Sequence, residues 1–440
     1  MTHAIEPAAR RLLFMAIAAT VVGCEGVLEV QDPDRYTSED LDEALDAVAA
    51  GVEGDLHDVL DHYVIYTALM SDVYTHTGTW IGYDDHDHGR ITYGNASGGG
   101  GGGGADGVMA ELLRVRWFAQ DAADRIGRVL EAQAASSPIM AQVQSVEAWT
   151  NLLLAQGWCE APAAADGPAV PDTEIYQLAL DEFDDALVYA EASGEDEWIT
   201  FNLAGRARTN LMLGNLDEAL ADARAVPDGF VKAALYSLTQ ENALVNLTTT
   251  GFNNAAGMRP KWWSMVDTAA DYLIDPYTGA LDTRVPIRYS PGALGVDGRT
   301  AHYSQFKLED RASDIPITHS DEMHLIEAEV HWRNGDHDLA IAVLDELRAA
   351  VGLDPLAPST DPDTVRDYLL HERFAELFME GHRMNDLHRF GLVGQLLADG
   401  AYGAESTSPR PTKFPLSEDE GRDNSNIEDD VSQRCLPMSS

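Results

Sequence analysis

The sequence predicts a mostly α-helical protein in which helix pairs are interrupted by long irregular insertions. Apolar residues recur at helical spacing in several stretches, and residues 213–220 and 334–341 share one helix-turn-helix pattern. Residues 75–107 and 246–318 are instead rich in glycine and aromatic residues. Of the 440 residues, 45% are apolar and 8% aromatic, which is enough for a sizeable core and excludes a wholly disordered chain.

The charge balance excludes two classes of partner. The chain has 74 acidic and 29 basic residues, a formal net charge of -45. Nucleic acids and anionic membrane surfaces both require basic patches on the protein, so neither is an expected partner. An acidic surface also keeps a protein solvated in a saline habitat, and we therefore do not take the charge as a sign of ligand binding.

The N-terminal segment predicts export and lipidation. Arg10 and Arg11 precede an apolar run, residues 12–22, that is too short to span a bilayer and is typical of a secretory signal peptide. The run ends in Val-Val-Gly-Cys24, which resembles the lipobox of bacterial lipoproteins. That resemblance implies removal of residues 1–23 and acylation of Cys24. The alternative is an ordinary signal peptide followed by an incidental cysteine.

Two further features bear on location and oxidation state. Cys24 is followed by Glu25 rather than by Asp, which favours the outer membrane under the enterobacterial sorting rule. No later segment approaches about 20 uninterrupted apolar residues, so lipid alone is the expected anchor. An oxidising compartment would permit a disulfide between Cys159 and Cys435, but two distant thiols do not establish one.

The helices are expected in the following order. Thr37 or Ser38 can cap a first helix that extends to Val52, because acidic residues fill its first turn. A second helical stretch is expected over residues 56–74. Apolar residues then mark a long amphipathic helix over residues 108–129 and another over residues 143–153.

Two later segments predict helix pairs of the tetratricopeptide type. In each, a helix ends near a glycine, Gly214 or Gly335, and a second helix begins after a polar residue. Glycine permits the tight reversal, and alanine lets the two helices approach closely. The two copies are not separated by the roughly 34 residues of a regular array. The sequence therefore predicts a helical scaffold broken by insertions rather than a continuous solenoid.

The insertions are the expected binding regions, because long loops on a rigid frame commonly carry function. Residues 75–107 contain seven consecutive glycines, Gly98–Gly104, for which we expect a mobile loop. Residues 246–318 show no helical period, and the tail over residues 403–440 is acidic and irregular.

Catalytic and metal motifs are not evident. Residues 84–88, Asp-Asp-His-Asp-His, could coordinate a metal, but a solvated acidic loop beside poly-glycine is the preferred interpretation. The sequence contains no nucleophile elbow, P-loop or dinucleotide-binding fingerprint. We therefore predict no enzyme activity, no cofactor and no metal.

The C-terminal half contains a charged motif over residues 372–391, ERFAELFMEGHRMNDLHRFG. This motif resembles the pattern E-R-x-x-E-L-x-x-E-G-x-R, followed by D-L-x-R-x-G, of the SusD/RagB family of outer-membrane nutrient-uptake lipoproteins. Residues 321–329, DEMHLIEAE, and Asp282-Thr283-Arg284 match two further family segments. The closing segment, residues 414–426, is degenerate because its second proline is missing.

This resemblance implies fold and function together. The fold would be a single SusD-like domain over residues 24–440, a right-handed scaffold of tetratricopeptide-like helix pairs, with the family motif region at 321–391. The function would be non-catalytic capture of an oligomeric nutrient and its delivery to a SusC-like TonB-dependent transporter. Glycan is the expected cargo and peptide the second choice. Two other hypotheses are a protein-binding scaffold without cargo and a surface hydrolase.

The charged residues of the family motif are expected to be architectural. Glu372, Glu376 and Glu380 share one helix face, with arginines nearby. Carboxylates and guanidinium groups at these spacings form charge-assisted hydrogen bonds that fix helix ends and loops, which we favour over catalysis. The remaining motif residues of this set are Arg373, Gly381, Arg383, Asp386 and Arg389.

Aromatic residues in the two insertions are the candidate ligand contacts. Sugars present C–H faces that stack on flat rings, and their hydroxyls need polar partners around the ring. The candidates are Trp80 and Tyr83 in the first insertion and Trp262 and Tyr277 in the second. The alternative is that these aromatic residues are buried and anchor their loops, as we expect for Trp263.

The lipidation hypothesis gives a direct prediction. Cys24→Ala removes the acylated thiol, so the variant should move from membrane to soluble fractions after cell lysis. Retention of the variant in the membrane fraction would refute the lipobox interpretation.

Overall fold

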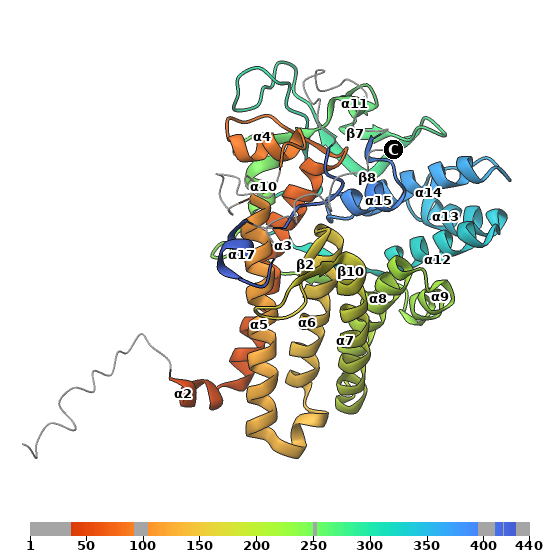
Figure 1. The fold of residues 1–440 in the computed structure, drawn as a ribbon. Helices are drawn as coiled ribbons and strands as arrows, with labels where there is room; N and C mark the ends of the chain where they lie inside the picture. The colour runs from red at the N-terminus through yellow and green to blue at the C-terminus, as the bar shows by residue number, and fades with distance from the viewer. Residues whose placement is uncertain (1–36, 92–103, 250–252, 395–409, 417, 428–440) are drawn as a thin grey trace, which may run out of the picture. The chain divides into compact units, whose positions relative to one another are not determined.

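The computed structural model describes residues 37–91, 104–249, 253–394, 410–416 and 418–427 (Figure 1). Residue contacts divide the chain into two units, Met1–Ala44 and Leu45–Ser440. In the first unit, α2 (Ser38–Asp42) is capped by Thr37, as the sequence predicted. The Thr37 side chain accepts a hydrogen bond from the Asp40 backbone, while the Asp40 carboxylate accepts one from the Thr37 N–H at 2.7 Å.

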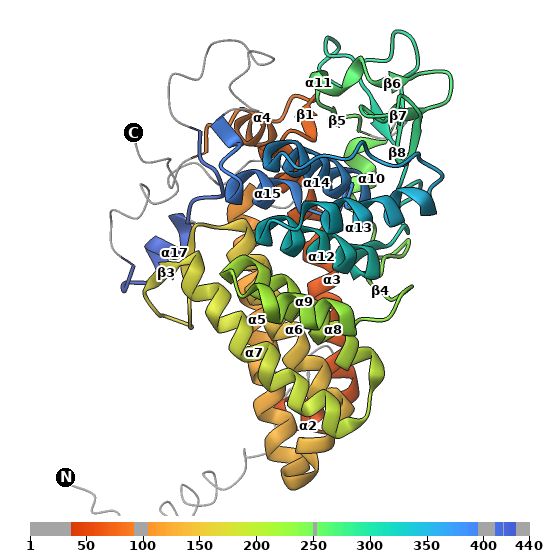
Figure 2. The same cartoon turned by 90° about the vertical axis from the view of Figure 1, so that its right-hand side faces the viewer.

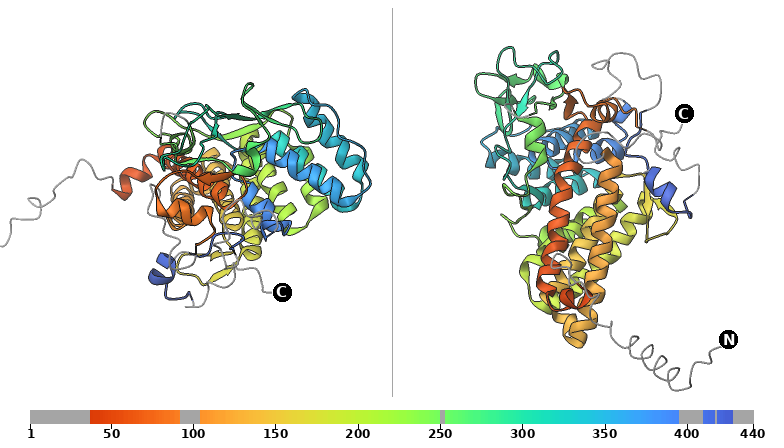
Figure 3. Two further views of the ribbon diagram at one scale, coloured as in Figure 1. Left: turned by 90° about the horizontal axis from the view of Figure 1, so that it is seen from above. Right: turned by 90° about the vertical axis from the view of Figure 1, so that its left-hand side faces the viewer.

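Four long helices form the body of the second unit, with α3 beside α5 in the sideways view (Figure 3). Their bounds are α3 (Leu45–Met70), α5 (Gly104–Leu130), α6 (Pro138–Gly157) and α7 (Asp172–Ser193). A short 3-10 helix, η1 (Glu131–Ser136), joins α5 to α6. Helices α5 and α6 cover the stretches that the sequence predicted.

The predicted break between two helices near residue 54 was wrong. Helix α3 is continuous through Gly51 and Gly54, and a Cβ atom added at either glycine would meet nothing within 4 Å. Val52, Leu56 and Leu60 are buried on one face, and this packing offsets the helix-weakening effect of the two glycines.

The two similar segments form helix pairs with matching turns. Helix α8 (Asp196–Leu213) is followed by α9 (Leu216–Ala225), and α12 (Ser320–Asn334) by α13 (His337–Ala350). The glycines between them, Gly214 and Gly335, have φ angles of 81° and 82°, the left-handed conformation that glycine adopts without strain. The mostly helical fold class is confirmed, while the tetratricopeptide handedness stays a prediction.

The second insertion is not irregular as expected, because short strands organise it (Figures 1 and 2). Runs of two or three residues are too short to show a period in the sequence. The eight-residue β8 shows no apolar alternation because its buried positions include Asp282 and Arg284. One four-stranded antiparallel sheet has the order β6 (Val266–Asp267), β7 (Tyr272–Ile274), β8 (Leu281–Arg288) and β9 (Ser304–Gln305). The other pairs are β1 (Tyr74–His76) with β5 (Ala256–Met258), β2 (Glu160–Pro162) with β3 (Ala169–Pro171), and β4 (Val231–Ala234) with β10 (Ile315–His319).

Shorter helices complete the described chain. They are α4 (Ile81–Asp87), α10 (Ala243–Thr248), α11 (Pro260–Trp263), α14 (Pro362–Glu376), α15 (Arg383–Arg389) and α17 (Glu418–Asp423). The first insertion therefore contains a strand and a helix before residue 92, contrary to the expected irregular loop. Of the poly-glycine run, residues 98–103 lie outside the described residues and Gly104 begins α5. No helix in the described part of the chain combines the length and the apolar character needed to cross a membrane.

Residues 410–416 return to the helical body and are buried in it. The Phe414 N–H donates to the Gly157 carbonyl at 2.9 Å, and the Phe414 side chain is fully buried beside Trp158. The ammonium group of Lys413 donates to the Ala155 carbonyl at 2.9 Å and to Asp172 at 2.7 Å. Cys159, next to this segment, is disulfide-bonded, whereas Cys24 and Cys435 lie outside the described residues.

Close packing at Gly205 gives a prediction about stability. A Cβ atom there would collide with the Phe183 ring and lie 2.9 Å from Cε2 of Trp149, so Gly205→Ala should destabilise the protein by about 1–3 kcal/mol. Gly127 also lies within a helix but has open space around it, so Gly127→Ala should stabilise by about 0.5–1 kcal/mol. Chemical denaturation of both variants measures this difference, and equal effects would contradict the packing described.

Candidate functional site

The candidate site is a hollow beside one face of α14, over residues 366–374. It encloses about 810 Å³, including its open mouth, and is bounded by α11, by the turn between β7 and β8, and by one face of α14. Three aromatic side chains line it, from Trp262, Tyr277 and Phe374, together with charged groups from Arg366 and Asp367. Two of the four aromatic residues predicted as ligand contacts therefore meet here.

Trp262 forms a fixed aromatic floor. Pro260 begins α11, and the Trp262 ring stacks on Phe374 with centroids 4.4 Å apart and planes 6° apart. The indole N–H donates to the Asp72 carbonyl at 2.7 Å, so the ring cannot rotate without losing a buried hydrogen bond. With Trp262 only 8% exposed, most of the ring is occupied by protein and its remaining surface faces the hollow.

Tyr277 forms an upright wall and is 38% exposed. Its ring meets Tyr368 edge to face, with centroids 4.7 Å apart, and also contacts His371 in the same manner. The hydroxyl donates to the Asp367 carbonyl at 3.0 Å. Burial raises the pKa of this hydroxyl above its ordinary value, which keeps it protonated as a donor.

A buried ionic cluster holds the turn that carries Tyr277. Arg348 donates to Asp275, the first residue of this turn, at 2.9 Å and to Glu372 of α14 at 2.6 Å. Arg284 of β8 donates to Glu372 at 2.7 Å and to Asp282 at 2.8 Å. Burial alone would raise the pKa of Asp275, but His371, whose Nε2 lies 3.4 Å away, and the hydrogen-bonded Arg348 hold it well below its usual range. The charged cluster therefore fixes the β7–β8 turn on α14.

The same residues do not suit a metal ion. Asp275, His371 and Glu372 bring potential ligand atoms within 4.8 Å of one another. Arg348 already bonds to both carboxylates and supplies the positive charge between them. We therefore assign this cluster to structure.

Residues 84–88 do not converge on a metal either. They lie on or beside α4, where Asp84 pairs with Arg90 and Asp87 pairs with the buried Arg259. His86 is buried, and Nδ1 lies 2.7 Å from the Gly82 carbonyl. Burial lowers the pKa of His86 to about 4. Helix geometry and arginine pairing thus account for this charged segment.

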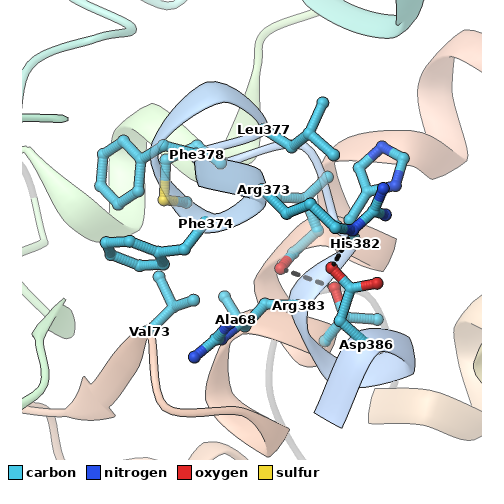
Figure 4. Close-up of a pocket in the computed structure, with 13 residues that line it drawn as sticks. Ala68, Val73, Arg373, Phe374, Leu377, Phe378, His382, Arg383 and Asp386 are labelled. Atoms are coloured by element: carbon cyan, nitrogen blue, oxygen red, sulfur yellow. Dashed lines mark hydrogen bonds and ion pairs between the residues drawn. The ribbon is translucent and has the colours of Figure 1, made fainter. Parts of the chain in front are cut away.

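The family-motif residues form ion pairs around α14 and α15 (Figure 4). Arg373 donates to Asp386 at 2.9 Å, and Arg389 bonds to both Asp386 and Glu329. Arg383 donates to Asp72 at 2.7 Å, which connects α15 to the end of α3.

The remaining motif residues also contact distant segments. Glu380 accepts from Lys307 at 2.7 Å and lies 3.0 Å from His319. Burial opposes the charge on Glu380, but Lys307 and His319 together lower its pKa to about 2. Glu376 accepts from Arg284 at 3.2 Å. Gly381 has φ 83° beside the Tyr63 ring, where a Cβ would be 3.1 Å from a ring carbon.

The structure separates the other two predicted aromatic contacts from the hollow. Trp80 precedes α4 and is 37% exposed, and its ring meets Tyr83 at 5.5 Å. Tyr83 is only 3% exposed and packs on Tyr66 in the core. The alternative interpretation, in which aromatic residues anchor a loop, therefore describes Tyr83.

Sequence reasoning missed the contribution of α14 to the hollow. Phe374 stands inside the family motif, and Tyr368 and His371 precede it on the same helix. The several aromatic residues of this helix were the sequence signal that could have indicated its part in the hollow. A second surface feature is a stack of three rings, with Tyr303 between Trp263 and Tyr289 at centroid distances of 4.8 and 4.3 Å.

The C-terminal part of the chain matches a known protein family, and the fold matches several solved structures. The model of the SusD family (SusD/RagB) matches residues 311–435, which include α12 to α15. A SusD superfamily protein from Bacteroides vulgatus is 14% identical, with 88% of this chain and 98% of that chain covered at a TM-score of 0.66. A SusD-like carbohydrate binding protein from the same species is 18% identical, with coverages of 79% and 83% and a TM-score of 0.56.

A third solved structure, a laminarin binding SusD-like protein, is 15% identical. The alignment covers 86% of this chain and 98% of that chain, with a TM-score of 0.53. No curated protein matches the sequence. At these identities, the likeness to solved structures establishes the fold.

The ionic cluster gives a prediction with a defined pH dependence. Arg348→Met leaves Asp275 as a buried carboxylate without its arginine and leaves Glu372 with Arg284 alone, so it should destabilise by about 3–5 kcal/mol at pH 7. The pKa of Asp275 should rise in the variant, so the loss should shrink as pH falls toward 4 and this carboxyl group becomes protonated. Urea denaturation at several pH values measures this dependence.

Arg224→Met is the matched control, since Arg224 is 54% exposed and pairs with Glu327. It should cost at most about 1 kcal/mol. Equal losses in the two variants, or a loss at Arg348 that is independent of pH, would contradict the proposed role of the cluster.

Proposed function

We propose that the chain is a member of the SusD/RagB family and a non-catalytic oligosaccharide-binding protein, because residues 311–435 match the SusD family model and the chain has the SusD-like fold. The observation that carries this proposal is the hollow in which Trp262, Tyr277 and Phe374 meet charged groups of α14. Two proteins of the same fold are a carbohydrate binding protein and a laminarin binding protein, which supports this ligand class.

The hollow has the two kinds of surface that a sugar needs. The exposed ring of Tyr277 can stack against the C–H face of a pyranose. Arg366 and Asp367 at the rim provide a donor and an acceptor for sugar hydroxyls. Tyr277 is already held by its hydrogen bond to Asp367 and by Tyr368, so little side-chain entropy would be lost on binding.

The chemistry of the hollow supports binding rather than hydrolysis. A retaining glycosidase needs two carboxyl groups about 5–5.5 Å apart across the sugar, one of which must be able to give up a proton. Here Asp275 and Glu372 are engaged by Arg348, and Asp367 pairs with Arg366 at 2.8 Å. Release of reducing ends from a glycan panel would overturn this part of the proposal and favour a surface hydrolase.

Delivery to a transporter completes the proposed function. Cys24 would tether the protein to the outer membrane by lipid, and a SusC-like TonB-dependent transporter would receive the cargo. Tethering keeps the binding protein close to the transporter and raises its effective concentration there. If no barrel transporter co-purifies with the lipidated protein from solubilised outer membranes, the delivery step fails while the binding proposal stands.

Removal of the exposed ring tests the binding site. Tyr277→Ala should weaken binding of the recognised oligosaccharide at least tenfold, about 1.4 kcal/mol, because the stacking surface is lost. Isothermal titration calorimetry with laminari-, malto-, xylo- and manno-hexaose, and with a mixed peptide pool, measures this loss. Tyr277→Phe retains the ring and should keep most of the affinity.

Trp80→Ala is the second comparison, since Trp80 is a similarly exposed aromatic residue outside the hollow. It should leave affinity unchanged. Loss of binding in Trp80→Ala but not in Tyr277→Ala would move the site to α4. If the protein binds the peptide pool and none of the hexaoses, its cargo is peptide rather than glycan.

A further inference from the structure

A second hollow lies on different elements, between α5, the β2–β3 hairpin and α17. It encloses about 640 Å³, including its open mouth. Helix α17 contacts α5, and Figures 1 and 2 place it apart from α11. The two hollows share no lining residue.

An exposed indole dominates this second hollow. Trp117 is 53% exposed, more than any other tryptophan among the exposed apolar residues of the described chain. The buried face of α5 carries Leu112, Val115 and Ala119, so packing of the helix does not require an aromatic residue at position 117. Trp117 is supported from one side by Phe118, whose ring centroid is 5.2 Å away. A large apolar ring is thus held over a polar recess.

The walls of the recess are joined by hydrogen bonds before any ligand binds. Arg116, only 4% exposed, donates to the Pro162 carbonyl at 2.8 Å and to Asn151 at 3.1 Å, which fixes the hairpin to α5 and α6. Asn424 donates to the Gly167 carbonyl at 2.7 Å, and Asn426 donates to the Asp166 carbonyl at 2.7 Å. A preformed recess of this kind reduces the entropy lost on binding.

The floor is close to neutral, because the two carboxyl groups beneath it share a proton and the Arg116 guanidinium offsets their remaining charge. Gln120 lines the recess and donates to Glu147 at 2.7 Å, and Asn151 donates to Glu182 at 2.6 Å. Burial, followed by the neighbouring Glu147, raises the pKa of Glu182 to about 8, so the pair retains a proton at neutral pH. The Gln120 amide is therefore held by a carboxyl pair that shares a proton.

The lining groups favour a neutral, hydroxyl-rich ligand. Asp166, Glu420 and Asp423 supply carboxylate acceptors, whereas the Arg116 guanidinium and the Gln120 amide supply donors. Hydroxyl groups both donate and accept, so they suit this mixture. The three carboxylates repel anionic sugars.

We propose that this recess is a second saccharide-binding site, in which a neutral pyranose ring stacks on Trp117. Two sites on one chain would let a long glycan bind at both, and the second contact would then form at high effective concentration. This second site is independent of the first hollow, because the ligand class proposed for it is argued only from the residues around Trp117.

Site-specific fluorine NMR tests this proposal on the full mature chain. The protein contains eight tryptophans, which can be replaced biosynthetically by 5-fluorotryptophan, and Trp117→Phe and Trp262→Phe assign the two resonances. The probes are laminari-, malto-, xylo- and manno-hexaose as neutral glycans, with trigalacturonate as the anionic glycan and trilysine as the cationic peptide. Trp198, which belongs to α8 and lines neither hollow, serves as the internal reference.

We expect a neutral hexaose to shift the Trp117 resonance in a saturable manner while Trp198 is unchanged. The shift should persist in Tyr277→Ala, since the recesses are separate. Calorimetry of the Tyr277→Ala variant should show the remaining affinity fall at least tenfold when Trp117→Ala is added. Because Trp117 is exposed, this substitution should leave the thermal midpoint within a few degrees of the parent.

The outcomes separate this proposal from the proposed function. A shift at Trp262 with none at Trp117 overturns the second site and leaves the first in place. A shift at Trp117 alone supports the second site and removes the first. No shift at either residue overturns both for neutral glycans. An equal or larger response of Trp117 to trigalacturonate or trilysine overturns the assigned ligand class, and an equal shift of Trp198 overturns site-specific binding.

Discussion

The arrangement of the first hollow depends on the buried bridge that Arg348 makes between Asp275 and Glu372. This bridge joins a turn between two strands to a helix almost a hundred residues later in the chain. Removing the guanidinium from water is costly, and that cost is recovered only because both carboxylates and a backbone carbonyl surround it. Its geometry then dictates where the turn lies, and with it the ring of Tyr277.

The aromatic surfaces illustrate two ways of positioning a ring. Trp262 is held by stacking on Phe374 and by the hydrogen bond from its indole N–H, so the orientation of its ring is fixed although little of the ring is exposed. Trp117 lies on a regular helix and offers most of its ring, while the hairpin and α17 shape the space beside it. In both cases polar contacts outside the ring, rather than the ring itself, define the recess.

The helical part of the fold was predictable because its signal is periodic and local. The capping by Thr37 and the turns at Gly214 and Gly335 follow from short-range chemistry that the sequence displays directly. The sheet around β8 and the helix α4 were missed, since strands of a few residues show no period and their partners are distant in sequence. Trp262 and Tyr277 could be nominated from residue type alone, but their meeting with Phe374 depends on tertiary packing that no local pattern encodes.

The buried return of residues 410–416 has a consequence for how the protein is made. Phe414 and Lys413 complete the packing of α6 and α7, which precede them by more than two hundred residues. The helical body therefore cannot close until nearly the whole chain has emerged from the ribosome. A nascent chain with this gap stays loosely packed until residues 410–416 have been synthesised and can dock.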